Sequence, residues 1–270
     1  MGRRVWILVA LAVLTLGTLG CGCCGVWTGF GAVRGSGQVV EEVREVSDFT
    51  GVELATAGTL TIEVGEREGL RIEAPVDLME LIETEVRDGT LVIDTRPTVG
   101  LRLWPRRSVN YYLTVKELDE IILSSSGDVE APDLEGGRFS VTISSSGRLD
   151  MGDLDADTLD VRITSSGGVR MGDLRADRIE VDIRSSGDLD VAGGQVEEQD
   201  VTITSSGSYR ARDLESAEAQ VRLTSSGSAT IRVREHLKAD LSSSGSLRYV
   251  GSPTLDVRTT SSGDVRQIGE

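Results

Sequence analysis

The tripeptide Ser-Ser-Gly recurs eight times from residue 125 onward. Successive glycines are separated by twenty residues five times and then by eighteen residues twice. A fixed period in this range is typical of a solenoid, in which each coil buries its apolar side only by stacking on its neighbours. The glycines of the tripeptide are Gly127, Gly147, Gly167, Gly187, Gly207, Gly227, Gly245 and Gly263.

The pattern inside each repeat indicates which kind of solenoid this is. Ahead of the tripeptide the apolar residues alternate with polar ones, as in Leu159, Val161 and Ile163. After the glycine a shorter alternating pair follows, such as Val169 and Met171, and then a polar corner. Period two is the signature of a strand with one buried face. Each coil is therefore predicted to hold two short strands and two corners.

Three other repeat architectures do not fit. Leucine-rich repeats need a recurrent Asn or Cys, and the only Asn of the chain is Asn110. Pentapeptide repeats would place apolar residues every five positions, and calcium-binding nonapeptide repeats need glycine and aspartate at period nine. We therefore predict an all-β fold, a single-stranded parallel β-helix of about ten coils with a repeat of about twenty residues.

The first serine of each tripeptide is predicted to face inward at a tight corner, where no larger side chain would fit. Counting by twos from Val161 brings the serine and the glycine to the inner side, where glycine permits unusual backbone angles and serine can bond to the next coil. A serine nucleophile is disfavoured, because catalysis needs one distinctive copy beside a base and the chain has one histidine, His236. The predicted column is Ser125, Ser145, Ser165, Ser185, Ser205, Ser225, Ser243 and Ser261.

The N-terminus reads as a targeting segment. Arg3 and Arg4 precede a long apolar run that ends in "TLGC", which resembles a bacterial lipoprotein signal with lipid attachment at Cys21. The rival is an uncleaved membrane helix, since no charge appears between Arg4 and Arg34. In either case the N-terminal segment anchors the protein to a membrane, and the residues that follow it lie outside the cytoplasm. Residues 1–20 are thus a signal peptide or membrane anchor, and 21–37 a Gly/Cys-rich linker.

Residues 38–117 are predicted to form an irregular β part that covers the first coil, and 118–270 the regular repeats. The stretch "GVELATAGTLTIEVG" is a degenerate coil with Ala57-Gly58 in place of Ser-Gly. Further on we expect a short helical turn capped by Asp77 and a hairpin turning at Asp88-Gly89.

Two columns of stacked acidic residues raise the question of whether the protein binds a metal ion. Asp160, Glu180 and Asp200 should stack about 4.8 Å apart, and either a cation or the neighbouring Arg162 and Arg184 must compensate them. The second column, at the corner, is interpreted as a repeated Asx turn in preference to calcium binding. We predict no metal site and no cofactor. The second column consists of Asp133, Asp153, Asp173 and Asp213.

Two features break the repetition. The stretch "GLRLWPRRSVNYY" is a candidate binding loop, because tryptophan beside arginine is common in binding hot spots, although Trp104 could also simply cover the core. At the other end, Val257, Val265 and Ile268 belong to a coil with no legible cap, so either end-to-end self-association or fraying is expected. The residues of the candidate loop are Arg102, Trp104, Arg106 and Arg107.

Several separate motifs resemble one bacterial family. The stretches "GSGQVVEEVREVSDFTGVEL", "LIETEVRDGTLVI" and "YYLTVKELDEIILSSSGDVEAPDL", with the serial Ser-Ser-Gly coils, are similar to the family called putative auto-transporter adhesin, head GIN domain (DUF2807). The resemblance implies a right-handed β-helix on an envelope protein that is often a lipoprotein. It implies no established activity.

The function classes follow from charge and fold together. A formal charge of −16 argues against a nucleic-acid partner. We expect a non-catalytic binding or adhesion module of the cell envelope, whose partner is an unknown envelope polymer or protein. The alternatives are a structural or assembly element of the envelope and, on fold analogy alone, a polysaccharide lyase or hydrolase.

Overall fold

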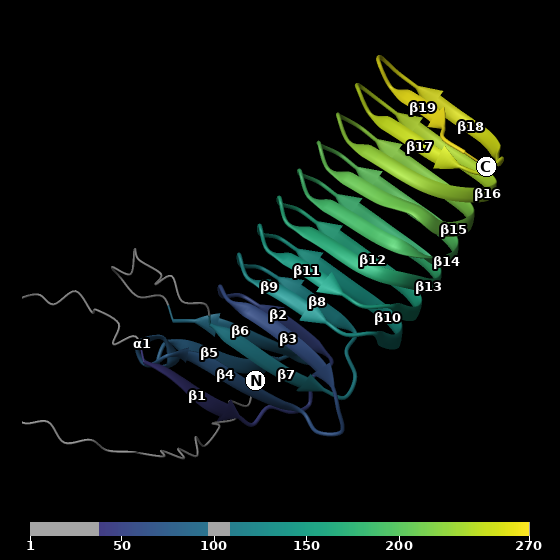
Figure 1. Ribbon diagram of the computed structural model, residues 1–270. Coiled ribbons are helices and arrows are strands. Elements are labelled where there is room, and N and C mark those ends of the chain that lie inside the picture. Colours follow the sequence, from purple (N-terminus) through teal and green to yellow (C-terminus); the bar gives the residue numbers. More distant parts are fainter. Residues whose placement is uncertain (1–37, 97–108, 270) are drawn as a thin grey trace, which may run out of the picture.

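The protein is an elongated parallel β-solenoid (Figure 1). The computed structural model describes residues 38–96 and 109–269. It has about seven turns, fewer than the ten expected from the repeats. The difference arises because part of the N-terminal region forms antiparallel strands and a helical turn instead of coils.

Coils stack with the register that the repeat predicts. In the regular part Val161 pairs with Val181 and Ile163 with Ile183, so identical positions of successive repeats lie side by side. The strands of this part are β8 (Glu120–Leu123), β9 (Asp128–Ala131), β10 (Leu134–Ile143), β11 (Arg148–Met151), β12 (Leu154–Ile163), β13 (Gly168–Ile183), β14 (Asp188–Ile203), β15 (Ser208–Leu223), β16 (Ser228–Leu241), β17 (Ser246–Val250), β18 (Thr254–Thr259) and β19 (Asp264–Gln267).

Each coil contributes to two faces. The residues before each tripeptide form the pre-turn face, and the residues after its glycine form the post-turn face. Strands β13 to β16 run through the corner, from the post-turn face of one coil to the pre-turn face of the same coil. Alternate residues such as Val161, Ile163 and Val169 are buried between the faces, and their neighbours point to solvent.

Glycine is required in the tripeptides because a larger residue would clash with the preceding coil. A Cβ at Gly167 would lie 2.5 Å from Ile143 Cγ2 and 2.6 Å from the carbonyl oxygen of Gly147 in the preceding coil. The described glycines with positive φ are Gly58, Gly89, Gly194 and Gly251, none of which belongs to a tripeptide. Of the two expected reasons, unusual backbone angles are therefore wrong, whereas the lack of room for a larger residue is confirmed by the close approach between coils.

The serines behave differently along the stack. Six of them are half-buried, and Ser145 donates a hydrogen bond to the carbonyl of Ser125 in the preceding coil. Ser243 and Ser261 are instead exposed and left-handed, with φ of 62° and 63°. These two belong to the coils shortened to eighteen residues, so the inward column does not extend through all eight positions.

The N-terminal part is threaded out of sequence order. Strand β2 lies between β6 and β8, and β3 lies between β7 and β9, all parallel. The first coil of the sequence is thus sandwiched between two later segments. The elements of this part are β1 (Val39–Arg44), β2 (Gly51–Leu54), β3 (Thr59–Val64), β4 (Gly69–Pro75), α1 (Val76–Met79), β5 (Ile82–Arg87), β6 (Thr90–Thr95) and β7 (Asn110–Val115).

Antiparallel strands form this end of the stack. Strand β5 pairs with β6 through a turn at Asp88 and Gly89, both with positive φ, as the hairpin motif predicts. On the other face β4 pairs with β7, and β1 pairs with β4. The helical turn begins after Pro75, whereas Asp77 lies within its first turn, so the expected Asp77 cap is wrong.

A buried polar cluster marks the point where the repeat shortens. The pairing of β15 with β16 shifts register beyond Ala211, which disturbs the ladder near Arg232. The Arg232 carbonyl accepts a hydrogen bond of 3.0 Å from Ser216, and the Gln199 amide donates to Ser216 at 3.0 Å. Tyr209 donates to Gln199 at 2.9 Å. Buried side chains thus satisfy polar groups around the irregular corner.

Candidate functional site

The post-turn face carries a row of charged side chains in register. Strand alternation places the third residue after each tripeptide glycine outward, and parallel stacking places these residues beside one another. From Asp150 to Arg210 their charges alternate in sign, whereas Glu130 precedes Asp150 with the same sign. The row runs through Asp150, Arg170, Asp190 and Arg210.

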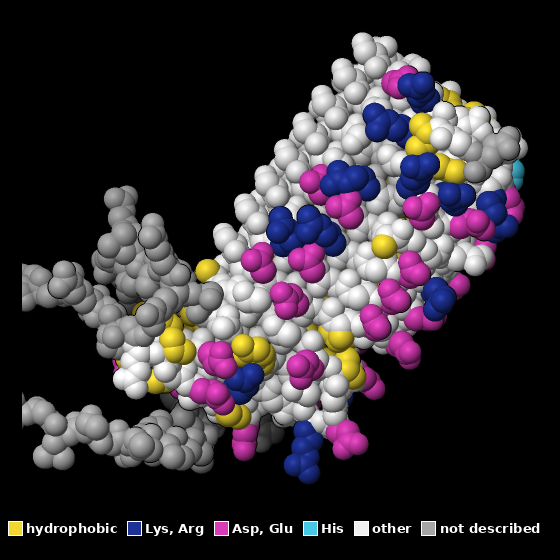
Figure 2. Space-filling view, in the orientation of Figure 1, with side chains coloured by type: hydrophobic (Ala, Val, Ile, Leu, Met, Phe, Trp, Pro, Cys, Tyr) yellow, Lys and Arg dark blue, Asp and Glu magenta, His cyan; other side chains and the backbone are white. Residues whose placement is uncertain are grey.

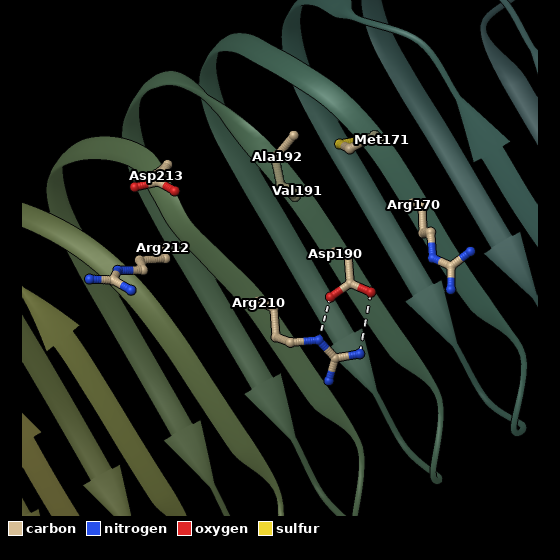
Figure 3. A pocket seen from close by; sticks show the side chains of 8 residues that line it. All are labelled: Arg170, Met171, Asp190, Val191, Ala192, Arg210, Arg212 and Asp213. Carbon is tan, nitrogen blue, oxygen red and sulfur yellow. Dashed lines mark hydrogen bonds and ion pairs between the residues drawn. The ribbon is translucent and has the colours of Figure 1, made fainter. Parts of the chain in front are cut away.

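Ion pairs join neighbouring members of this row. Arg210 forms a close pair with Asp190, with its second bond at 3.2 Å, and lies 3.5 Å from Asp188 (Figure 3). Arg170 lies 3.7 Å from Asp150. The hydrogen bond that Arg210 donates to the Asp190 carboxylate raises the pKa of Arg210 above its ordinary value, so the guanidinium stays charged. Each exposed pair stabilises the fold only slightly, which leaves these groups available for recognition.

A depression of about 360 Å³ lies over this row. Met171, Val191 and Ala192 contribute apolar atoms, and Arg212 and Asp213 approach from the corner (Figure 3). Charged groups above an apolar floor suit a ligand that has both polar groups and apolar ring or chain surface. A second hollow, of about 620 Å³, is lined by carboxylates that include Glu117, Asp119 and Asp155.

The corner aspartates bond between coils. The Asp133 carboxylate accepts a hydrogen bond from the Asp153 amide at 2.9 Å, and the Asp153 carboxylate accepts one from the Asp173 amide at 2.8 Å. The interpretation as Asx turns within one coil is therefore wrong for these residues. Their carboxylates connect successive coils, because the twenty-residue register brings each one to the next amide.

Asp160 and Asp200 of the pre-turn acidic column are compensated by arginines, though not by those expected. Arg138 pairs with Asp160 at 2.7 Å, and Arg178 pairs with Asp200 at 3.1 Å. Arg162 and Arg184 instead approach Asp182, at 4.0 and 2.7 Å. In the part of the chain that the structure describes, no group of three or more His, Cys, Asp or Glu residues is arranged to hold a metal ion.

The remaining predicted sites lie outside the described residues. These are the lipidation site Cys21 and the candidate loop residues Arg102, Trp104, Arg106 and Arg107. The charged row of the post-turn face was not foreseen. Its signal is nonetheless present in the sequence, since "GRLD", "GGVR", "GDLD" and "GSYR" alternate acid and base at one repeat position.

The fold and this face define a class of protein: a parallel β-solenoid that presents ordered rows of side chains. The profile of the family described as putative auto-transporter adhesin, head GIN domain (DUF2807) matches residues 48–172 and 152–253. The chain belongs to this family. No curated protein sequence matches it.

Solved structures share the fold. A putative lipid binding protein from Parabacteroides distasonis is 22% identical, with a TM-score of 0.77 over 87% of this chain and 98% of that one. A putative adhesin from Parabacteroides merdae is also 22% identical, with a TM-score of 0.76 over the same shares. A putative adhesin from Bacteroides fragilis is 19% identical, with a TM-score of 0.67 over 87% and 99%. At these identities the likeness shows the solenoid fold.

Proposed function

We propose that this chain is a non-catalytic binding module of the bacterial cell envelope. The observation that carries the proposal is the post-turn face. Its outward side chains form rows in fixed register, and part of one row lines a shallow depression. Such a surface offers charged groups at regular intervals, which suits an extended partner. Membership in an adhesin-like family supports the same role.

The protein is proposed to reach the envelope through its N-terminus. Lipid attachment at Cys21, or an uncleaved apolar segment, would anchor it outside the cytoplasm. Among residues 38–96 and 109–269, no helix is long and apolar enough to cross a membrane. Metabolic labelling with a fatty acid tests the anchor: Cys21→Ala should lose the label and leave the membrane fraction. A wild-type protein that stays membrane-bound without label would favour the uncleaved segment.

Binding without turnover separates the proposal from its rivals. The full-length chain, solubilised in a nonionic detergent, is titrated against envelope fractions and isolated envelope polymers. Saturable binding with the polymer recovered intact supports a binding module. Release of shortened products would support a lyase or hydrolase, and absence of any saturable binding would favour a structural element.

We further propose that the C-terminal end of the solenoid associates with a second copy. Leu255 and Val257 of β18 have exposed fractions of 46% and 37%, although their equivalents in earlier coils are buried. Apolar side chains and an open strand edge at one end of a solenoid favour association.

A further inference from the structure

The alternation of charge on the post-turn face stops near the C-terminal end. After Arg210 the row continues with Thr230, Arg248 and Arg266, each in register with the previous one. Arg248 and Arg266 are therefore direct neighbours with no acid between them. Adjacent strands lie about 4.8 Å apart, and like charges at that separation repel.

These arginines have no acidic partner within the described chain. Arg248, Arg266 and Arg212 are exposed, and no ion pair joins any of them to another described residue. Arg232 lies between them in the sequence and contacts Asp213 at 3.4 Å and the Arg212 carbonyl at 3.2 Å. We name the group Arg210, Arg212, Arg232, Arg248 and Arg266 the arginine strip.

On the opposite face the bases of these coils are kept apart, although the acids Asp160, Glu180 and Asp200 of earlier coils stack directly. On the pre-turn face of the same coils, Asp240 lies in register between Arg222 and Arg258. The acid separates the two bases there, as acids do earlier on the post-turn face. The arginine strip departs from this arrangement, and Lys and Arg side chains gather toward the C-terminal end of the solenoid in Figure 2.

The surroundings limit the shape of an anionic ligand. The chain has a formal charge of −16, and Asp188, Asp190 and Asp213 border the strip. A broad anionic surface, such as a membrane or a nucleic-acid duplex, would meet these carboxylates and be repelled. A narrow linear chain can follow the arginines and avoid the acids. Guanidinium groups bind carboxylates with two parallel hydrogen bonds.

We propose that the arginine strip binds a linear acidic polysaccharide, with its carboxylates on Arg248 and Arg266 and its axis along the solenoid. The inference rests on the proposed binding function and names its ligand class. The apolar atoms of the neighbouring depression, from Met171 to Ala192, continue the path and can contact sugar rings.

Polygalacturonate is the test probe, titrated against the full-length chain in nonionic detergent at low and physiological salt. Arg248→Glu/Arg266→Glu should lower the affinity at least about tenfold, because two charge-assisted contacts are reversed in sign. Arg162→Glu/Arg222→Glu is the matched control, with the same change in net charge on the pre-turn face and away from β18. It should stay within about twofold of wild type. Thermal unfolding of both variants checks that they fold.

Each other outcome overturns the inference. An equal loss in both variants would show a response to net charge alone. Tighter binding of polyphosphate than of polygalacturonate would assign a phosphate polymer, and binding to vesicles with 20% anionic lipid would assign a membrane. If polygalacturonate fails while envelope fractions still bind saturably, the polysaccharide is wrong and the binding function stands. If neither binds, both proposals fall.

Discussion

At the residue scale, the turn glycines act through close packing between coils. Gly167 and Gly168 are adjacent in the sequence, yet their surroundings differ. A Cβ at Gly167 would lie 2.6 Å from the Gly147 carbonyl, whereas one at Gly168 would meet only the Asp188 carbonyl, at 3.5 Å. The first distance is a clash and the second is ordinary contact.

Gly167→Ala is therefore expected to destabilise the fold by about 1–3 kcal/mol, the usual cost of overpacking. Gly168→Ala is the control and should change the stability by less than about 0.5 kcal/mol. Urea unfolding of both variants measures the difference. Equal effects from the two substitutions would contradict the packing explanation.

A second residue-scale prediction concerns Tyr111, which is fully buried in β7. Its hydroxyl lies near Thr56 without meeting the geometry of a hydrogen bond, and burial raises its pKa to about 12. The folded protein therefore holds the phenol proton more tightly than the unfolded chain does. The resulting stability is complete below pH 10 and is lost as the pH rises toward 12, by up to roughly 2 kcal/mol.

Tyr111→Phe removes this titration and an unpaired buried hydroxyl. Stability at pH 8 should stay equal or rise slightly, and the loss between pH 10 and 12 should become smaller. Chemical unfolding at a series of pH values checks both. A variant with the same alkaline slope as wild type would show that Tyr111 does not contribute to it.

At the element scale, the main consequence of the topology is that the first coil, formed by β2 and β3, lies inside the stack and not at its end. Strands β2 and β3 have parallel neighbours on both sides, although they come early in the chain. Strand β18 pairs only with β16 among the described strands, and all of its residues are exposed.

Amide hydrogen exchange should reflect this arrangement. Exchange in β2 and β3 is expected to be slower than in β18 by roughly two orders of magnitude, because strands paired on both sides open only with the core. Mass spectrometry of proteolytic fragments gives the rates. Exchange in β2 as fast as in the edge strand β1 would contradict the sandwiched arrangement.

At the scale of the whole molecule, the C-terminal end is complementary to itself. Asp256 and Arg258 flank Val257 on β18, and Asp264 and Arg266 flank Val265 on β19. Antiparallel pairing of β18 with a second copy, centred on Val257, would set Asp256 opposite the partner's Arg258. The same pairing would bury Leu255 and Val257 between the copies.

The protein is accordingly expected to dimerise in a concentration-dependent way. Val257→Asp, and likewise Val265→Asp, should give a monomer, because a buried unpaired carboxylate is costly. Val43→Asp is the control at the opposite end, where Val43 is 67% exposed on β1. Light scattering gives the mass. A wild-type monomer at all accessible concentrations, or loss of the dimer only with Val43→Asp, would refute this interface.

The repeat and the alternation of apolar residues are sufficient to predict the solenoid, its period and most of its core. Ser-Ser-Gly every twenty residues and strict alternation, as in Val161 and Ile163, permit few other ways to bury apolar side chains. The hairpin at Asp88-Gly89 was equally readable, because it depends on two adjacent residues. The hairpin depends on neighbouring residues alone. The coils are repeated, so the pattern of one coil predicts the structure of the others.

The order of the coils and the pairing of charges follow only from the three-dimensional arrangement. The order of the coils depends on pairings between β2, β6 and β8, which are distant in the sequence and carry no repeated motif. The same holds for which arginine compensates which acid, since Arg178 reaches Asp200 from another coil. The unbalanced pair of Arg248 and Arg266 emerges only when the register makes them neighbours. Each of these depends on contacts across the stack, which composition and local pattern do not specify.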